Sequence, residues 1–474
     1  MDIDKKGLWF IVVLSAILSA LCIDDGHNWG GDFALYIEQS KSILAGTTQE
    51  LCEANKYAMD NSRMMLGPYL YPIGLPFLLS FLYALVGLNF VVLKVVCLCF
   101  FIASLPFFYK LFQNRFTNNT AALLVLVAVA WHPSFLTFSD NVLSDFPFLF
   151  ISSLTLWLLY KQPKLNTQHQ VGLAILISIG LLFRSAGLVL IPTLFVAQLV
   201  DYFQHQVPKD RGFSKWLQYL IPYIIIVGIM VFMDQLYPRD DSVYIHELLL
   251  NLGSTSRWGS IAYYSYYLGK LPISLSNKFL PHTIVLVGSG LVWSLALIAM
   301  AIRWKKDLVL LTFFGSVLAL HILWPIGFGL RLVFPIVPLF IYFVAQGITI
   351  ISDKLKIKHS LIILSLLVAV QGVATSIHFY KTSTNEIFED KNTEIFNYIK
   401  TNIAPDKVIC FFKPRVLRLL TERNSVFLTN AKKILASEAE YLLDYRYNEV
   451  PRDPKNFKKL KKSKDLVLYQ IYKD

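Results

Sequence analysis

The chain has 474 residues, of which 55% are hydrophobic and only 16% are charged, and its mean hydropathy is +0.52. This composition excludes an ordinary soluble globular protein and indicates a protein that crosses a membrane many times. The formal net charge is +12, but the basic residues gather in short loops and in the tail, so we do not expect nucleic acid as a partner.

Apolar runs recur along the chain until about residue 377 and then stop. The first run follows Lys5 and Lys6 and has no obvious cleavage site of small residues, so it predicts a retained span rather than a signal peptide. Each run is roughly long enough to cross a hydrocarbon core of ~30 Å. We predict about eleven spans, near residues 8–23, 89–109, 120–137, 146–160, 171–183, 187–203, 217–235, 281–302, 308–323, 332–351 and 359–377.

The stretch "YLYPIGLPFLLSFLYALVGL", residues 69–88, decides the topology. As a full span it would invert every later loop. As a helix that lies along the outer face, it leaves all the later basic loops on the inner side, as the positive-inside rule requires. These loops carry Lys110 and Arg115; Lys161 and Lys164; Lys209, Arg211 and Lys215; Arg303, Lys305 and Lys306; and Lys354, Lys356 and Lys358. We therefore expect an inner amino terminus, a first outer loop over 24–88 and an outer carboxyl terminus.

With this topology, polar residues from distant parts of the chain gather at the outer face. Ionisable groups at membrane depth usually line a cavity or pair with one another, which makes them functional candidates. The alternatives are solvated loop positions, helix caps, and basic side chains that reach to lipid headgroups. The candidates are Asp24, Asp25, Asp32 and Tyr36 in the first outer loop, Lys94 in the second span, Asp140 and Asp145 between the third and fourth spans, and Arg184 and Arg331 at later outer turns.

These residue types match one kind of chemistry. An enzyme that transfers a group from a phosphate-linked lipid needs a carboxylate to accept a proton and cations to stabilise the departing phosphate. Asp32 would supply the carboxylate, and Lys94, Arg184 and Arg331 the cations. A transporter would also carry internal charge, but it would be expected to show internal repeats and broken helices near the midplane, and we find no convincing repeat.

Several stretches in order resemble the GT-C class of membrane glycosyltransferases, in the branch with protein O-mannosyltransferases and lipid A aminoarabinose transferases. They are "GGDFALYIEQSKSILAG", "YPIGLPFLLSFLYALVG", "NFVVLKVVCL", "FLTFSDNVLSDFPFLF", "FRSAGLVLIP" and "GLRLVFPIVPL". The resemblance implies inverting transfer of a sugar from a polyprenyl-phosphate donor at the outer face, and amphipathic helices along that face.

The resemblance also implies roles for single residues. The catalytic acid of the first outer loop falls on Asp32. The acid of the second outer turn falls on Asp145, with Asp140 nearby, and they would orient the acceptor or hold an arginine. The basic positions fall on Lys94 and on Arg331, which precedes a Pro-x-x-Pro stretch.

The chain departs from the family pattern at two of these motifs. Many relatives carry Asp-Glu where Asp32 is followed by Phe33, so a second carboxylate would come from Asp24 or Asp25. A Lys-Pro-Pro-Leu stretch of the aminoarabinose transferases is replaced by "YPIGLP". The donor sugar and the acceptor, whether lipid, glycan or protein, therefore stay open.

We expect no required cofactor, since cations already balance the leaving phosphate, and a divalent metal is not favoured. The expected home is the bacterial plasma membrane. The alternatives are a non-catalytic protein that binds or flips a polyprenyl-linked glycan, and a solute transporter.

The chain is expected to divide into a transmembrane domain, 1–380, and a small extracytoplasmic α/β domain, 381–474. In the second, "NTEIFNYIKTNI" and "KPRVLRLLTER" predict helices, and "KVICFF" and "DLVLYQIY" predict strands. The stretch "KNFKKLKKSK" is interpreted as a solvated basic helix face, with contact to anionic headgroups or to an acidic acceptor as the alternative. Cys22 and Cys52 flank the first outer loop, either as a disulfide or as two thiols.

Overall fold

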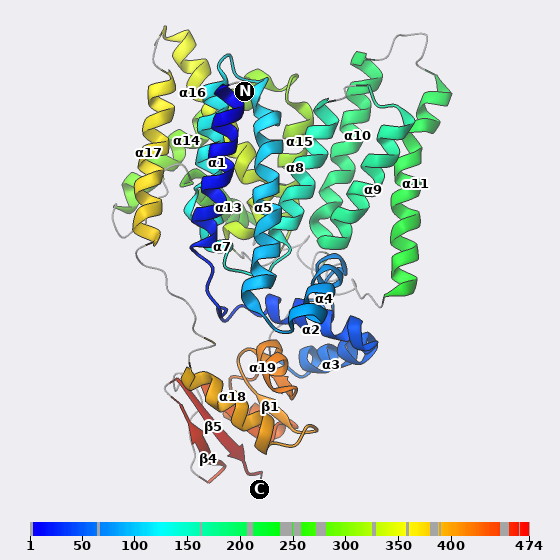
Figure 1. Cartoon of the computed structure of the whole chain (residues 1–474), viewed down its shortest axis with the longest axis vertical. Coiled ribbons are helices and arrows are strands. Elements are labelled where there is room, and N and C mark those ends of the chain that lie inside the picture. Colours follow the sequence, from blue (N-terminus) through cyan, green and yellow to red (C-terminus); the bar gives the residue numbers. More distant parts are fainter. Residues whose placement is uncertain are drawn as a thin grey trace.

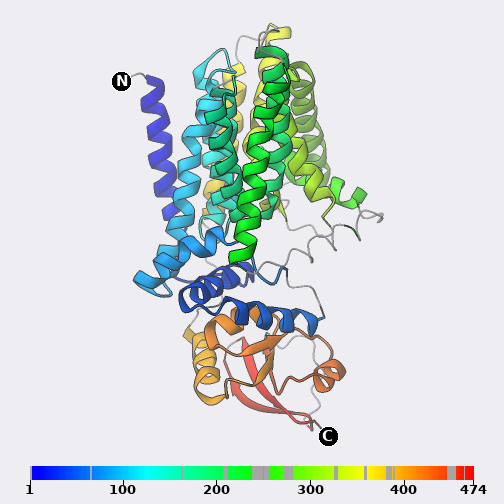
Figure 2. The same cartoon turned by 90° about the vertical axis from the view of Figure 1, so that its right-hand side faces the viewer.

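The protein is built in three layers along its long axis (Figures 1 and 2). A bundle of long helices forms one end, three shorter helices lie across the base of the bundle, and a small α/β unit follows beyond them. The structure is a computed structural model that describes residues 3–63, 67–161, 164–205, 212–237, 249, 257–271, 281–324, 329–356, 360–379, 387, 390–445, 455–463 and 465–473. Lys209, Arg211, Lys358 and the expected domain boundary at 380/381 lie outside these residues.

A helix lies on every predicted span, so the predicted helical membrane fold class is confirmed. Six helical segments of the described chain are long and apolar enough to cross a membrane by length and composition. The bundle also contains α13 (Arg257–Gly269), which was not predicted. The helices on the predicted spans are α1 (Ile3–Ala20), α5 (Phe90–Gln113), α6 (Asn119–Ala130), α8 (Asp145–Lys161), α9 (Thr167–Phe183), α10 (Leu190–Val200), α11 (Phe213–Leu236), α14 (His282–Arg303), α15 (Leu308–Ile322), α16 (Val337–Lys354) and α17 (Ser360–Phe379).

Three predicted spans are not single α-helices. The span predicted over 120–137 breaks after Ala130, and a separate helix, α7 (Pro133–Phe138), follows. Proline disfavours a helical conformation of the residue before it, and His132 instead caps α7 by accepting a hydrogen bond from the Ser134 amide. The 3₁₀ helices η1 (Ser185–Val189) and η4 (Leu330–Ile336) precede α10 and α16, and a π-helical turn, η2 (Asp201–His205), follows α10.

The segment predicted as the first outer loop, residues 24–88, forms the middle layer, which is called the outer layer below; it contains α2 (Asp32–Ala45), α3 (Thr48–Asp60) and α4 (Gly74–Val86). At 13 residues, α4 is about 20 Å long, too short to cross a bilayer. It packs on α2 at the base of the bundle (Figure 1). A side chain at Gly74 would lie 2.7 Å from the Leu182 carbonyl oxygen, so glycine permits the close approach of α4 to α9. Residues 69–88 therefore lie along one end of the bundle, as predicted.

The α/β unit contains a five-stranded sheet in the order β2-β1-β3-β5-β4. Strand β1 pairs in parallel with β2 and β3, whereas β5 pairs antiparallel with β3 and β4. The elements are α18 (Asp390–Asn402), β1 (Val408–Cys410), α19 (Pro414–Thr421), β2 (Asn424–Val426), α20 (Ala431–Ala436), β3 (Tyr441–Tyr445), β4 (Phe457–Lys462) and β5 (Leu466–Ile471).

The interpretation of "KNFKKLKKSK" as a helix face is wrong, because residues 457–462 form the edge strand β4. The lysines that were attributed to a helix lie on an exposed strand instead. Charged side chains on a sheet edge oppose pairing with a further strand, so the lysines of β4 protect this edge from such pairing.

A single hydrophobic core joins the middle layer to the α/β unit. Phe33 and Leu75 of the outer helices belong to the same buried cluster as Ile399 and Val416 of the α/β unit. The two layers are therefore packed together rather than connected only by the chain.

Candidate active site

Asp32 lies at the first position of α2, where the helix meets the base of the bundle. Its Oδ1 accepts a hydrogen bond from the Tyr71 hydroxyl at 2.7 Å, and its Oδ2 lies 2.6 Å from Nη1 of Arg331. Burial alone would raise the pKa of Asp32, but the Arg331 guanidinium and the Tyr71 hydroxyl outweigh it and lower the pKa to about 2. The side chain is ionised at neutral pH and remains partly exposed.

Two arginines meet at a second carboxylate next to Asp32. Asp145 begins α8, and its Oδ2 accepts from Nε of Arg331 at 3.0 Å while its Oδ1 lies 2.8 Å from Nη1 of Arg184. The side chain of Asp145 is only 3% exposed. Arg184 directly precedes η1 and Arg331 is the second residue of η4, so breaks in two spans place both guanidiniums at the same end of the bundle.

Aromatic and hydroxyl groups complete the surroundings of these charges. Tyr36, one turn along α2 from Asp32, shares a hydrogen bond with the Ser144 hydroxyl at 2.8 Å. Its ring stacks on that of Tyr71, with ring centroids 4.5 Å apart. Burial raises the pKa of Tyr36 above its ordinary value, so the phenol stays protonated and can act as a hydrogen-bond donor.

Lys94 belongs to a separate network. Its ammonium contacts the carbonyl oxygen of Asp24 at 3.0 Å, Oδ1 of Asp24 at 2.9 Å and Oδ1 of Asp140 at 2.5 Å. The Lys94 side chain is fully buried. All three of its donors are therefore used, and phosphate binding by Lys94 would require these contacts to break. Asp140 also accepts from the Asp24 amide at 3.0 Å, which holds the first outer loop against the bundle.

Asp25, Cys22 and Cys52 were also singled out in the sequence. Asp25 is exposed in the first outer loop. Cys22 and Cys52 are not joined by a disulfide. Over the described parts of the chain, no group of three or more His, Cys, Asp or Glu side chains is arranged to hold a metal ion.

The α/β unit brings two further cations towards Asp32. Arg415 is buried in α19, donates to the Pro68 carbonyl at 2.7 Å and lies over the Tyr71 ring, and its charge helps to lower the pKa of Asp32. Burial lowers the pKa of Lys413, which precedes α19, whereas the negative charge of Asp32 opposes that change.

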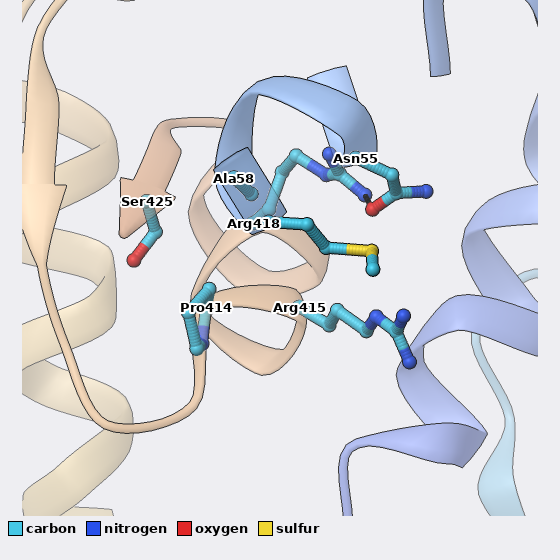
Figure 3. Close-up of a pocket in the computed structure, with 7 residues that line it drawn as sticks. Asn55, Ala58, Pro414, Arg415, Arg418 and Ser425 are labelled. Carbon is cyan, nitrogen blue, oxygen red and sulfur yellow. Dashed lines mark hydrogen bonds between the residues drawn. The ribbon is translucent and has the colours of Figure 1, made fainter. Parts of the chain in front are cut away.

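The same helix is anchored to the outer layer by a buried ion pair. Arg418 donates to both oxygens of Glu38, at 2.7 and 2.8 Å, and to Oδ1 of Asn55 at 2.7 Å. Figure 3 shows Arg415 and Arg418 reaching from α19 towards the outer-layer helices. The cavity that they line is about 10 Å³, enough for one water molecule and too small for a substrate.

The sequence did not indicate Tyr71, Ser144, Lys413 or Arg415 as site residues. Ser144 directly precedes Asp145, and Tyr71 lies in a motif that was interpreted only as a surface helix. Arg415 lies in the basic stretch "KPRVLRLLTER". Each has a weak local signal. The packing of α19 and α4 against α2 brings Lys413, Arg415 and Tyr71 near Asp32, and the start of α8 brings Ser144.

Comparisons with known proteins agree with this architecture. Residues 71–233 match the family model of dolichyl-phosphate-mannose-protein mannosyltransferases. A search by sequence among curated proteins finds no match.

Several solved structures share the fold. ArnT from Cupriavidus metallidurans in the apo state has a TM-score of 0.60 and 13% identity, over 99% of this chain and 98% of that one. The same ArnT bound to undecaprenyl phosphate has a TM-score of 0.58 and 12% identity, over 97% of both chains. The oligosaccharyltransferase AglB from Archaeoglobus fulgidus, in complex with an inhibitory peptide and a dolichol-phosphate, has a TM-score of 0.56 and 11% identity, over 94% of this chain and 70% of that one. The resemblance to the GT-C class that the sequence indicates is thus confirmed at the level of the fold.

Proposed function

We propose that this GT-C-fold protein is an inverting glycosyltransferase that moves a sugar from a polyprenyl-phosphate donor to an acceptor at the outer face of a membrane. The observation that carries the proposal is the chain of contacts Asp32–Arg331–Asp145–Arg184. It joins a partly exposed carboxylate to two guanidiniums at the end of the bundle, and transfer from a lipid phosphate requires these groups together.

The reaction needs a base on one side of the anomeric carbon and cations on the other. An acceptor hydroxyl or amine attacks the anomeric carbon and loses its proton to Asp32. The bond between that carbon and the phosphate oxygen breaks, and its electron pair stays on the phosphate. Arg184 and Arg331 balance the second negative charge that the polyprenyl phosphate then carries. Attack opposite the leaving phosphate inverts the configuration.

Arg331 has a further part in this mechanism, because Asp32 and the donor phosphate compete for it. While Arg331 contacts Asp32, the pKa of Asp32 is about 2 and the carboxylate is a weak base. A phosphate that draws Nη1 of Arg331 away leaves burial as the main influence on Asp32, and its pKa rises. Donor binding therefore activates the base, and the donor should bind before proton transfer can occur.

The neighbouring residues act through these groups. Tyr71 holds one oxygen of Asp32 and directs the other towards the acceptor. Asp145 holds Arg184 and Arg331 side by side. Asp24 and Asp140 fix the first outer loop through Lys94, whose predicted role as a phosphate ligand stays a prediction.

The proposed donor class rests on the family match and on the neighbours. The matching family model is named for a dolichyl-phosphate-linked sugar, and the ArnT structure of similar length contains undecaprenyl phosphate. A lipid, glycan or protein is proposed as the acceptor. We also propose a location in the bacterial plasma membrane, with the amino terminus in the cytoplasm and the α/β unit outside.

The proposal is tested by incubating the purified protein with a radiolabelled polyprenyl-phosphate sugar and candidate acceptors, and following label that leaves the lipid. The wild type should release label, and Asp32→Asn should reduce release by about 10³-fold or more, since the amide cannot accept the proton. Asp60→Asn is the matched control, because it removes an exposed carboxylate of the same outer layer.

Both variants should keep the elution volume and unfolding temperature of the wild type to within a few degrees. Release of label by Asp32→Asn at the wild-type rate would contradict the assignment of the base. Movement of intact labelled lipid or of a solute across vesicles, without release of label, would instead identify a flippase or a transporter.

A further inference from the structure

A second polar cavity lies at the opposite end of the bundle from Asp32. Its volume is about 610 Å³. Helix α8 connects the two ends, since it begins at Asp145 beside the candidate active site and ends at Lys161 in the cavity wall. Its 17 residues separate them by about 25 Å. The cavity is therefore distinct from the proposed transfer site.

Basic residues from three helix ends and two turns converge on this cavity. The cations are Lys110, Arg115, Lys161, Arg303 and Lys306, and the single acid in the wall is Asp307. Five positive charges against one negative charge leave an excess of four in the lining.

Asp307 lies at the floor of the cavity, and its negative charge pairs with two arginines there rather than with the lysines near the opening. Its side chain is fully buried, and its two oxygens lie 3.0 Å from Nε of Arg115 and 2.7 Å from Nε of Arg303. The Tyr342 hydroxyl donates to the same carboxylate at 2.8 Å. The Arg115 guanidinium also lies 3.9 Å from the centre of the Tyr160 ring. Both guanidiniums are thereby held in fixed orientations.

The lysines lie above this floor. Lys110 and Lys161 both approach the Trp157 ring, at 4.9 and 4.8 Å from its centre. Among the residues that the structure describes, neither of these lysines nor Lys306 forms an ion pair with a carboxylate. Three ammonium groups and two oriented guanidiniums thus surround a space that is large enough for a phosphate ester.

The positive-inside rule and the dipoles of helix carboxyl ends account for basic residues at this end of a bundle. They do not require these residues to converge on one cavity, nor a buried carboxylate that orients two arginines at its floor. We propose that this cavity binds the phosphate headgroup of an anionic phospholipid.

The position of the cavity favours a membrane lipid over a soluble phosphate. It opens where α5 and α8 end, at the end of the bundle where α1 begins (Figure 1). Trp157 lines the wall, and tryptophan is typical of the boundary between headgroups and acyl chains. Phe107 lies one turn before Lys110 and contacts Trp157, so an apolar surface leads from the cations towards the lipid-facing side of the bundle. Basic pockets between membrane helices on the cytoplasmic side are known to bind acidic headgroups.

The test is a titration of the purified full-length protein in neutral detergent with phosphatidylglycerol or phosphatidylcholine, in which bound lipid is counted by native mass spectrometry. The wild type should bind one phosphatidylglycerol in preference to phosphatidylcholine. The double variant Lys161→Gln/Lys306→Gln should bind it about 25-fold more weakly, since each lysine near a phosphate contributes about fivefold. These lysines are exposed, so the variants should fold normally.

The matched control is Lys305→Gln/Lys354→Gln, which removes the same charge from exposed positions at the same end of the bundle but outside the cavity. Its affinity should stay within about twofold of the wild type. Equal weakening in both double variants would overturn the proposal, because attraction to the general charge of that surface would then explain binding.

Soluble competitors separate the lipid from a free anion. Glycerol 3-phosphate and inorganic phosphate should displace phosphatidylglycerol only at concentrations several hundredfold higher. Displacement by either at equal concentration would overturn the assignment to a lipid and identify a site for a soluble phosphate.

Discussion

Replacement of Arg331 by lysine tests whether one guanidinium has to serve two carboxylates and the donor phosphate. Arg331 contacts Asp32 through Nη1 at 2.6 Å and Asp145 through Nε at 3.0 Å. Lysine keeps the charge, but a single ammonium lacks the fixed fork that spans both carboxylates. One charge-assisted hydrogen bond, worth about 1.5–3 kcal/mol, should be lost. If the transition state loses the full contribution of this hydrogen bond, kcat/KM for transfer from a polyprenyl-phosphate sugar should fall about 10- to 150-fold.

The assay is release of label at subsaturating donor, compared among wild type, Arg331→Lys and Arg331→Met. The methionine variant, which lacks the charge as well, should be slower than the lysine variant. Arg63→Lys is the control, since Arg63 is an exposed arginine of the outer layer whose side chain, among the described residues, forms a hydrogen bond with Thr429 and no ion pair. Wild-type kcat/KM in Arg331→Lys, or equal rates in the lysine and methionine variants, would refute the reasoning.

Three further predictions follow from contacts around the site. The pKa of Asp32 is lowered to about 2 from an ordinary 3.8, so its ionisation should add about 2 kcal/mol to the free energy of unfolding above about pH 4, and this contribution is lost as the pH falls through 2. The difference in thermal stability between wild type and Asp32→Asn should therefore disappear near pH 2. A difference that does not depend on pH would contradict this. Glu38→Gln leaves Arg418 without a charged partner in a largely buried setting and should weaken the docking of α19 by about 3 kcal/mol. The backbone amides of residues 414–421 should then exchange hydrogen faster. Unchanged exchange rates would argue against this anchor. Lys94→Met should lower the unfolding temperature by several degrees, because two carboxylates lose their shared partner. The Kd for the donor should stay the same. A higher Kd with an unchanged unfolding temperature would support the phosphate-binding role of Lys94 instead.

Hydropathy and basic loops were enough to predict the helical bundle and its outer layer. The apolar runs are long and uninterrupted, and the inner-loop rule excludes a span at residues 69–88, where the structure has the short helix α4. The break after Ala130 was missed because the run stays apolar across it, although Pro133 was a local signal. The edge strand at 457–462 was missed because its sequence does not alternate: the apolar residues Phe457 and Leu460 are three positions apart, and a register shift between Lys459 and Lys461 interrupts the strand.

The candidate site was predicted only in part, since its contacts join residues far apart in the chain. The resemblance and the charge pattern indicated Asp32, Asp145, Arg184 and Arg331, and the structure brings all four together. The same reasoning grouped Lys94 with them, because the position of a residue within a predicted span indicates its depth in the membrane but not the direction in which its side chain points. Its contacts with Asp24 and Asp140 depend on how the first loop folds back on α5.

The contribution of the α/β unit could not be predicted at all. Lys413 and Arg415 lie almost 400 residues from Asp32 in the chain, in a segment whose charge is equally consistent with a solvated surface. Only the shared core of the outer layer and the α/β unit places α19 beside α2.

A structure of the protein with bound polyprenyl phosphate would test the central claim most directly. We predict that the phosphate lies within hydrogen-bonding distance of Arg184 and Arg331, and that Nη1 of Arg331 has moved out of contact with Asp32 while Tyr71 still donates to that carboxylate. A phosphate bound elsewhere, with the contact between Asp32 and Arg331 intact, would contradict the account.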